Sequence, residues 1–138
     1  YYDSARETLY FIDEYYAHKK SNAETAQWIL DKGYTDAYII CDSAEPKSVA
    51  DYRAMGLPAR GAAKGPGSIE YSMKFLQRRK IVIDRRRTPH AYEEFVNYEY
   101  ERDRDGNFIT GYPDGNDHII SACRYGCEPL YRRMGVIA

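Results

Sequence analysis

Residues 38–46 read YIICDSAEP, an apolar run that ends at Asp42 and leads through small residues to Pro46. A short apolar run bounded by turn-forming residues is typical of a buried strand. Open α/β sheets place their functional sites at the edge where their strands end. The segment therefore predicts an α/β sheet that carries one carboxylate, Asp42, at that edge.

A second polar cluster, DGNDH at residues 114–118, opens an apolar pattern that predicts a last helix continuing to about Cys127. Hard cations such as Mg²⁺ and Mn²⁺ need several oxygen ligands, which one short segment cannot supply. A strand end and a distant helix start that are both acidic can supply them together. We therefore expect Asp42 and the acidic start of the last helix to meet at a metal-dependent site.

Composition limits the classes of function that remain open. The length of 138 residues suits one domain. A charged fraction of 30% with a formal net charge of -1 excludes a strongly basic protein. Contact with nucleic acid must then come from local patches, such as RRK at residues 78–80 and RRR at residues 85–87. Such a patch is either a solvated face beside a short strand or a surface for DNA phosphates, and the sequence leaves both open.

The cysteines and the hydropathy indicate the cellular setting. Three cysteines, Cys41, Cys123 and Cys127, form an odd set without CxxC spacing, which argues against a zinc site and a disulfide scaffold. No apolar run reaches the roughly 20 residues that span a bilayer, and no signal peptide opens the chain. We expect structural cysteines and a soluble protein in a reducing, cytoplasmic setting.

Helical and strand patterns alternate along the chain, which predicts an α/β domain with a mixed sheet. No internal repeat or low-complexity segment interrupts them. The expected elements are a hairpin of residues 1–3 and 8–16, a helix from residues 21–22 to 33, a strand at 37–41, a helix at 46–54, a strand at 58–63, a helix from 68, a strand at 81–83, a helix from 88–89, a hairpin of 98–101 and 107–110, and a helix at 115–127.

Three segments together carry a family resemblance: DSAEPKS at residues 42–48, AKGPGSI at residues 63–69 and DHIISACRY at residues 117–125. With them the chain resembles the C-terminal nuclease domain of phage terminase large subunits, the RNase H-like part of the DNA-packaging motor. The resemblance implies an RNase H-like mixed sheet flanked by helices over residues 1–127, followed by a loosely held tail at 128–138. It also implies that the first strand of the sheet is missing. Because the sequence begins with Tyr1 rather than Met, we expect the chain to be an excerpt from a longer polypeptide.

In domains of this type, aspartates on the first strand, at the end of the central strand and on the last helix hold divalent metals. Asp42 matches the central one, and the first would lie before Tyr1. Ser121 stands where the last-helix aspartate is expected, and its neutral hydroxyl is a weaker ligand for a hard cation. Asp117 lies one helical turn earlier on roughly the same face, and we expect it to replace the missing carboxylate.

Three further polar residues are candidates for the site, and two of them, His118 and Glu14, match polar positions of the family. His118 could orient a ligand or a phosphate, although a histidine at a helix start is as often a capping or surface residue. Glu14 follows the second visible strand as a candidate auxiliary ligand or as an exposed strand-end residue. Lys64 enters a glycine-rich turn that suits contact with the DNA backbone or is a simple turn. The Walker A spacing is absent there, so ATP binding is not supported.

The resemblance implies a metal-dependent endonuclease domain that cuts concatemeric double-stranded viral DNA during packaging in the host cytoplasm. It implies Mg²⁺ or Mn²⁺ in a two-metal site, with DNA, the terminase small subunit and the portal protein as partners. This fragment alone is expected to be inactive. The expected site residues are Asp42, Asp117 and His118 for catalysis, Asp42, Asp117, Ser121 and Glu14 for metal, and Lys64, Arg78, Arg79, Arg85 and Arg86 for DNA.

Two other interpretations stay open at this point. A catalytically degenerate remnant of a terminase, serving as a DNA-binding or assembly module, would explain Ser121. Another RNase H-like enzyme, such as a junction resolvase, is the third interpretation.

Overall fold

A computed structural model describes residues 1–133 of the chain, with side chains up to Arg132. The chain divides into two compact units. The first unit comprises residues 1–15 and 79–121, and the second comprises residues 16–78 with the segment from residue 122 onward. Each unit is described by itself.

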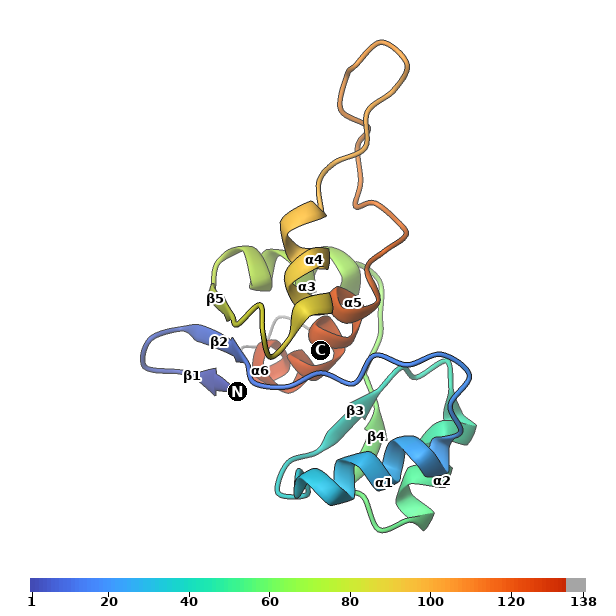
Figure 1. Cartoon of the computed structure of the whole chain (residues 1–138). Helices are drawn as coiled ribbons and strands as arrows, with labels where there is room; N and C mark the ends of the chain where they lie inside the picture. Colours follow the sequence, from blue (N-terminus) through green and yellow to red (C-terminus); the bar gives the residue numbers. More distant parts are fainter. Residues whose placement is uncertain (134–138) are drawn as a thin grey trace. The chain divides into compact units, whose positions relative to one another are not determined.

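The first unit contains a three-stranded sheet in the order β1-β2-β5 (Figure 1). β1 (Tyr2–Asp3) is antiparallel to β2 (Thr8–Phe11), and β2 is parallel to β5 (Lys80–Ile83). The tight turn between β1 and β2 forms because the Asp3 carboxylate accepts the backbone N–H groups that follow it. Antiparallel and parallel pairing meet at β2, so the predicted mixed sheet is present in this unit.

Two helices of the first unit follow the sheet. α4 (Pro89–Asn97) begins with a proline, which suits the first helical turn because its missing N–H would be unpaired there. Phe95 of α4 packs edge-on against Phe11 of β2, with ring centroids 5.2 Å apart. α5 (His118–Gly126) begins in this unit and ends in the second.

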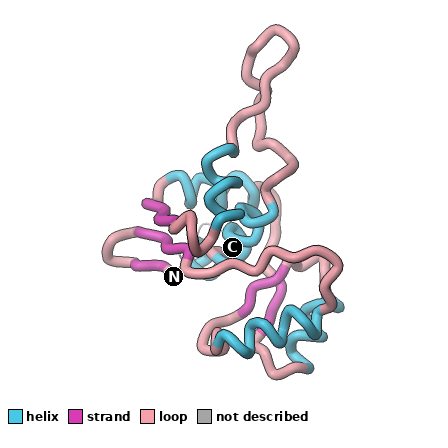
Figure 2. Tube along the Cα trace, in the orientation of Figure 1, coloured by secondary structure: helices cyan, strands magenta, loops and turns pink. Residues whose placement is uncertain are grey.

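The second unit is built around a parallel pair of strands, β3 (Ile39–Cys41) and β4 (Ala59–Gly61) (Figure 2). α2 (Pro46–Ala54) lies in the connection between them, because parallel strands need a long crossover, which is usually a helix. α1 (Asn22–Lys32) packs on α2. β3 pairs with β4 alone among the strands that the structure describes.

Local signals fix both ends of α1. Ser21 and Glu24 form a reciprocal capping box at its start, and Gly33 adopts a φ of 72° at its end. Glycine takes this left-handed conformation without steric cost. The predicted helix from residues 21–22 to 33 is confirmed on this basis.

One part of the core of the second unit lies between α3 (Ser68–Gln77) and α6 (Glu128–Arg133). Phe75 and Tyr131 are both buried, with ring centroids 5.7 Å apart. Glu128 is fully buried and pairs with Arg60 at 2.5 Å. The expectation of a loosely held tail is therefore wrong for the start of that segment, and residues 134–138 lie outside the described residues.

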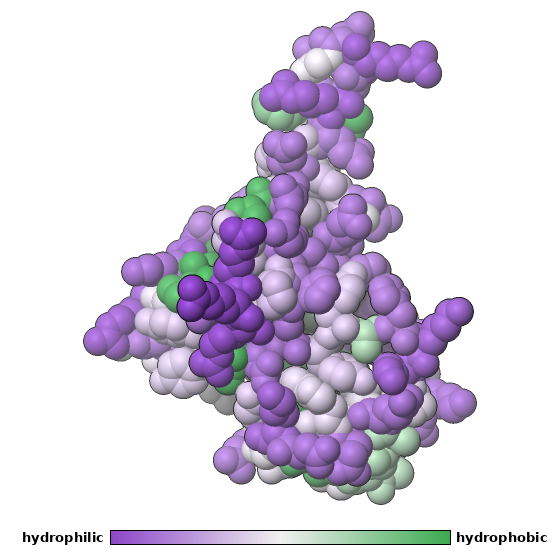
Figure 3. Space-filling view, in the orientation of Figure 1, coloured by the Kyte–Doolittle hydropathy of each residue, from purple (hydrophilic) through white to green (hydrophobic). Residues whose placement is uncertain are grey.

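The hairpin expected at residues 98–110 is the main difference from the predicted elements. Its two arms form a single antiparallel bridge, Arg102 to Phe108, and no strand. The segment leaves α4 as a long loop (Figure 1), and its visible face is largely hydrophilic (Figure 3). Two strands without a third strand or a helix to cover one face are marginally stable in water, which explains why the ladder does not extend.

Candidate metal and DNA site

Asp42 follows β3 directly and begins the turn into α2. Its Oδ1 accepts a hydrogen bond from the Ala44 backbone N–H at 2.9 Å and forms an ion pair with the Lys64 ammonium. The Tyr125 hydroxyl lies 3.4 Å from Oδ2, and the Lys64 Nζ lies 4.9 Å from the Tyr125 ring centroid. These contacts place a cation on the carboxylate that the sequence predicted as a metal ligand.

The backbone of the parallel pair brings Lys64 to Asp42. Cys41 and Gly61 are register partners at the ends of β3 and β4, and the Ala62 N–H donates to the Cys41 carbonyl at 2.8 Å. A Cβ on Gly61 would come within 3.2 Å of the Ser43 Cβ, so the close approach of the two chains favours glycine there. The strand ends therefore meet at one edge, as expected for parallel strands.

Electrostatics keep both groups of this pair charged. The backbone hydrogen bond from Ala44 and then the Lys64 ammonium lower the pKa of the Asp42 carboxyl, outweighing the opposing effect of its partial burial. The hydrogen bond to Asp42 raises the pKa of Lys64. The side chains remain 39% and 38% exposed, so solvent screens the pair and an incoming ion or phosphate can reach it. An ionised, accessible carboxylate is the kind of donor that Mg²⁺ and Mn²⁺ take, and here the Lys64 ammonium occupies one of its oxygens.

Asp117 and Ser121 lie together at the start of α5 in the first unit. The Ser121 Oγ donates to the Asp117 Oδ2 at 3.2 Å, and the Ser121 N–H donates to the Asp117 carbonyl at 2.7 Å. The structure thus brings these two predicted residues onto one helical face. His118, the first residue of α5, is exposed beside them.

Glu94 is a residue that sequence reasoning missed. It lies on α4, and its Oε2 accepts the backbone N–H groups of Ile119 at 2.7 Å and of Ile120 at 3.1 Å. The partners are 25 and 26 residues away in the sequence. No local pattern marks such a contact, because it depends on how two helices pack.

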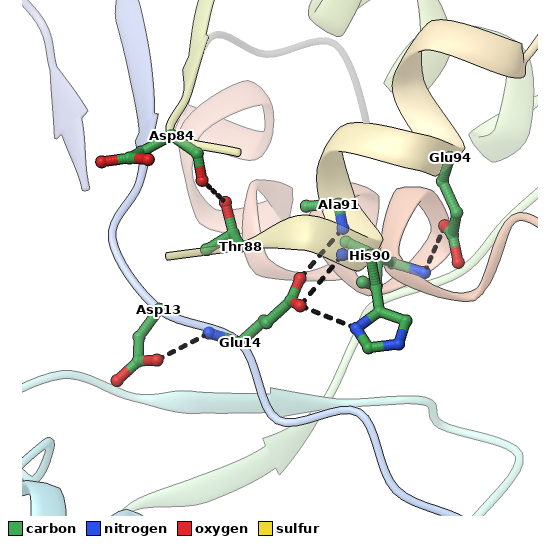
Figure 4. Close-up of polar contacts among 8 residues, drawn as sticks. Asp13, Glu14, Asp84, Thr88, His90, Ala91 and Glu94 are labelled. Atoms are coloured by element: carbon green, nitrogen blue, oxygen red, sulfur yellow. Dashed lines mark hydrogen bonds and ion pairs between the residues drawn. The ribbon is translucent and has the colours of Figure 1, made fainter. Parts of the chain in front are cut away.

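Glu14 lies beyond the end of β2 and points at the first turn of α4 (Figure 4). Its carboxylate accepts the backbone N–H groups of His90 and Ala91 at 3.0 and 2.9 Å, and it lies 2.8 Å from the His90 Nδ1. Burial alone would raise the pKa of Glu14, but the hydrogen bonds from His90 and Ala91 outweigh it and lower the pKa. The carboxylate is therefore a helix cap in this structure, and its role as a metal ligand stays a prediction.

The predicted DNA-binding residues differ in exposure. Arg78, Arg85 and Arg86 are exposed, and the Arg85 guanidinium lies 5.2 Å from the centroid of the Tyr92 ring. The Arg79 side chain is only 8% exposed, since its Nε donates to the Tyr2 hydroxyl at 3.1 Å. Arg79 therefore ties β5 to β1, while the other arginines present their charge to solvent.

The predicted metal ligands are divided between the two units. Asp42 belongs to the second unit, while Asp117, Ser121 and Glu14 belong to the first. Within the described residues of either unit, no three histidine, cysteine, aspartate or glutamate side chains are grouped as a metal site. The meeting of Asp42 with Asp117 remains a prediction.

The fold and these strand-end and helix-start acids define a class of protein. The chain belongs to the family of terminase RNase H-like domains, whose profile, described as "Terminase RNAseH like domain", matches residues 2–128. The resemblance drawn from the sequence is confirmed. No helix among residues 1–133 combines the length and apolar character needed to cross a membrane.

Particular relatives come from Bacillus and its phages. The chain is 37% identical to the terminase large subunit of Bacillus phage SPP1, across 99% of this chain and 33% of the relative. It is 32% identical to the PBSX phage terminase large subunit of Bacillus subtilis (strain 168), across 91% of this chain and 29% of the relative. The chain thus spans about a third of the length of these curated relatives.

A solved structure confirms the fold class. The crystal structure of the g2p (large terminase) nuclease domain from the bacteriophage SPP1 with bound Mn matches with a TM-score of 0.82 at 38% identity. The match covers 94% of this chain and 75% of that one. The fold is RNase H-like, and the chain is homologous to the nuclease domain of a phage large terminase, an RNase H-like DNA-packaging domain.

Proposed function

We propose that this domain is a divalent-metal-dependent endonuclease that cuts concatemeric double-stranded viral DNA for packaging. The observation that carries the proposal is the Asp42 carboxylate at the end of β3, ionised and paired with the Lys64 ammonium. A nuclease site needs a charged oxygen donor for a metal and a cation for a phosphate, and this pair provides both. The relative of known structure contains bound Mn, which supports metal dependence.

Asp42, Asp117 and Ser121 would hold two Mg²⁺ or Mn²⁺ ions, and Glu14 would join them as an auxiliary ligand only by giving up part of its cap on α4. Such ions, when bound, activate water and stabilise the leaving oxygen of a phosphodiester. Asp117 would supply the charge that Ser121 lacks. The hydrogen bond from the Ser121 hydroxyl would hold the Asp117 carboxylate over the helical face they share.

Lys64 would change partner when the site is loaded. Its ammonium leaves Asp42 as the metal charge arrives and binds a phosphate of the DNA backbone, because an ammonium is a compact point charge. His118, exposed at the start of α5, would orient a phosphate or a ligand. The role of His118 follows from a position matched to the family, and that of Lys64 follows from the glycine-rich turn that it enters.

Arginines on the surface would hold the duplex. Arg78, Arg85 and Arg86 are exposed, and each phosphate that such a side chain neutralises adds salt-dependent affinity. Arg79 would contribute through the sheet that it braces. By resemblance, the terminase small subunit and the portal protein are the partners of the whole protein, which would act in the host cytoplasm.

A plasmid-nicking assay with Mn²⁺ tests the proposal. The comparison is between this chain, a longer chain with the upstream sequence, and Asp42→Ala and Asp117→Ala variants of the longer one. We expect cutting by the longer chain, abolished by either substitution, and none by the shorter chain. Cutting that persists without Asp42 would overturn the ligand assignment.

A second candidate function rests on Ser121, which replaces a charged ligand by a hydroxyl. On this alternative the domain is a degenerate terminase remnant that binds DNA or assembles with partners. Titration with Mn²⁺ separates the two functions, because a remnant would show no specific site even in the longer chain.

A further inference from the structure

Two glutamates in the first unit cap helices that follow them in the chain (Figure 4). Glu14 accepts the N–H groups of the second and third residues of α4, His90 and Ala91. Glu94, on α4 itself, accepts those of the second and third residues of α5, Ile119 and Ile120. The same pair of positions is bonded in both helices.

These are the N–H groups that a helix normally bonds to the side chain of its own N-cap residue. Thr88 precedes α4 but makes no side-chain cap bond, since its hydroxyl donates to the Asp84 carbonyl at 3.1 Å. Asp117 precedes α5, and its carbonyl accepts the first helical bond from Ser121. An aspartate at this position is among the strongest N-cap residues.

The Asp117 carboxylate instead accepts the Ser121 hydroxyl at 3.2 Å. Glu94 already satisfies the N–H groups of Ile119 and Ile120, so the helix does not need the Asp117 side chain. A carboxylate bound to two backbone N–H groups would have fewer lone pairs left for a metal. Because Glu94 of α4 caps α5, the Asp117 carboxylate keeps lone pairs that could bind a metal.

We propose that Glu94 is a positioning residue that takes over the N-cap of α5 and thereby frees the Asp117 carboxylate for metal binding. Without Glu94, Asp117 turns to cap its own helix and leaves the metal. Glu14 holds the start of α4 by the same device. This inference rests on the proposed function for its metal step, whereas the exchange of caps does not.

Mn²⁺ affinity tests the metal step in the longer chain. Glu94→Ala should weaken Mn²⁺ binding by about tenfold or more, as for other residues that orient metal ligands. Glu94→Gln keeps an acceptor oxygen and should restore most of the affinity. The matched control is Glu93→Ala, which removes an exposed carboxylate that bonds Asn97 within the same helix. If the Ala and Gln variants lost Mn²⁺ affinity equally, the negative charge of Glu94 and not its cap on α5 would be responsible, and the proposal would be overturned.

A double-mutant cycle tests the exchange of caps without any metal. Glu94→Ala alone should cost little stability because Asp117 replaces the cap, and Asp117→Ala alone should cost little because Glu94 remains. The double variant should lose more than the sum of the two, with fast hydrogen exchange at the Ile119 and Ile120 amides. Additive losses would overturn the inference, even if Mn²⁺ binds as expected. Absence of Mn²⁺ binding in the parent chain would instead refute the proposed function and leave this cycle intact.

Discussion

The Lys64 ammonium is paired with the Asp42 carboxylate at the point where β3 and β4 end together. A positively charged side chain thus contacts the carboxylate oxygen that we propose as a metal ligand. The pair links the two predicted roles, because on the proposed function the Lys64 ammonium and a metal ion would compete for the Asp42 carboxylate. A Lys64 ammonium displaced in this way would be available to a DNA phosphate.

Replacing Lys64 by methionine should therefore separate metal binding from DNA binding. Without the competing ammonium, Mn²⁺ should bind a few-fold more tightly in the absence of DNA, since exposed pairs contribute little energy. Affinity for duplex DNA should fall and become less dependent on salt. Calorimetry with Mn²⁺ and fluorescence anisotropy with DNA measure the two effects. Lys74→Met, which removes an exposed ion pair with Glu70 on α3, is the control, and weaker Mn²⁺ binding by the Lys64 variant would contradict the argument.

The pH dependence of stability should report the Glu14 cap. Its hydrogen bonds to His90 and Ala91 lower the pKa of the folded carboxyl, so the unfolded chain binds the proton more readily. The contribution of Glu14 to the free energy of unfolding is therefore full above the ordinary glutamate pKa of about 4.3. It is lost as the pH falls through the lower pKa of the folded protein. Urea unfolding between pH 6 and pH 3 should show a shallower fall for Glu14→Gln than for the parent. If the free energy of unfolding fell equally steeply with pH in both proteins, the pKa of Glu14 would be the same in the folded and unfolded chains, which would contradict the prediction.

Glu128 should anchor α6 through Arg60. The carboxylate is fully buried, and Arg60→Met would leave it without its closest cation. Breaking such a pair costs about 3 kcal/mol in buried settings, which the partial exposure of Arg60 reduces to about 2 kcal/mol here. Arg132→Met removes a more distant and exposed partner at 3.7 Å and should cost under about 0.5 kcal/mol. Urea unfolding measures the loss of stability in both variants. Equal losses would mean that any positive charge near Glu128 stabilises the protein, and not the close pair with Arg60 in particular.

An exchange of residues on α5 should show whether Asp117 replaces the family aspartate. Asp117→Asn should abolish tight Mn²⁺ binding in the longer chain, because no other charged ligand lies on this turn. Adding Ser121→Asp to that variant restores a carboxylate one turn later and should recover binding. Calorimetric titration with Mn²⁺ measures each variant. Unchanged affinity in Asp117→Asn would remove Asp117 from the site.

Interactions within a few residues explain the elements that could be predicted. The capping box of Ser21 and Glu24 and the left-handed Gly33 bound α1 at the predicted residues. Pro46 and Pro89 begin α2 and α4 as expected from their fixed φ and missing N–H. The hairpin expected at residues 98–110 was not predictable in this way, because its strands needed a third strand or a helix against one face, and the sequence does not show whether one packs there.

The sequence by itself determined the order of helices and strands from β1 to α4 and the acidic residues at a strand end and a helix start, and its resemblance to the terminase family indicated the RNase H-like class. The helices and strands depend on periodicity and caps, which are local properties of the chain, whereas the class depends on the family resemblance that three segments carry. Tertiary structure alone decided that Lys64 holds Asp42, that Glu14 caps α4 and that Glu94 caps α5, across 22, 76 and 25 residues. Such contacts follow from which chain segments pack together, and a carboxylate has the same sequence signature whether it caps a helix, pairs with a lysine or awaits a metal.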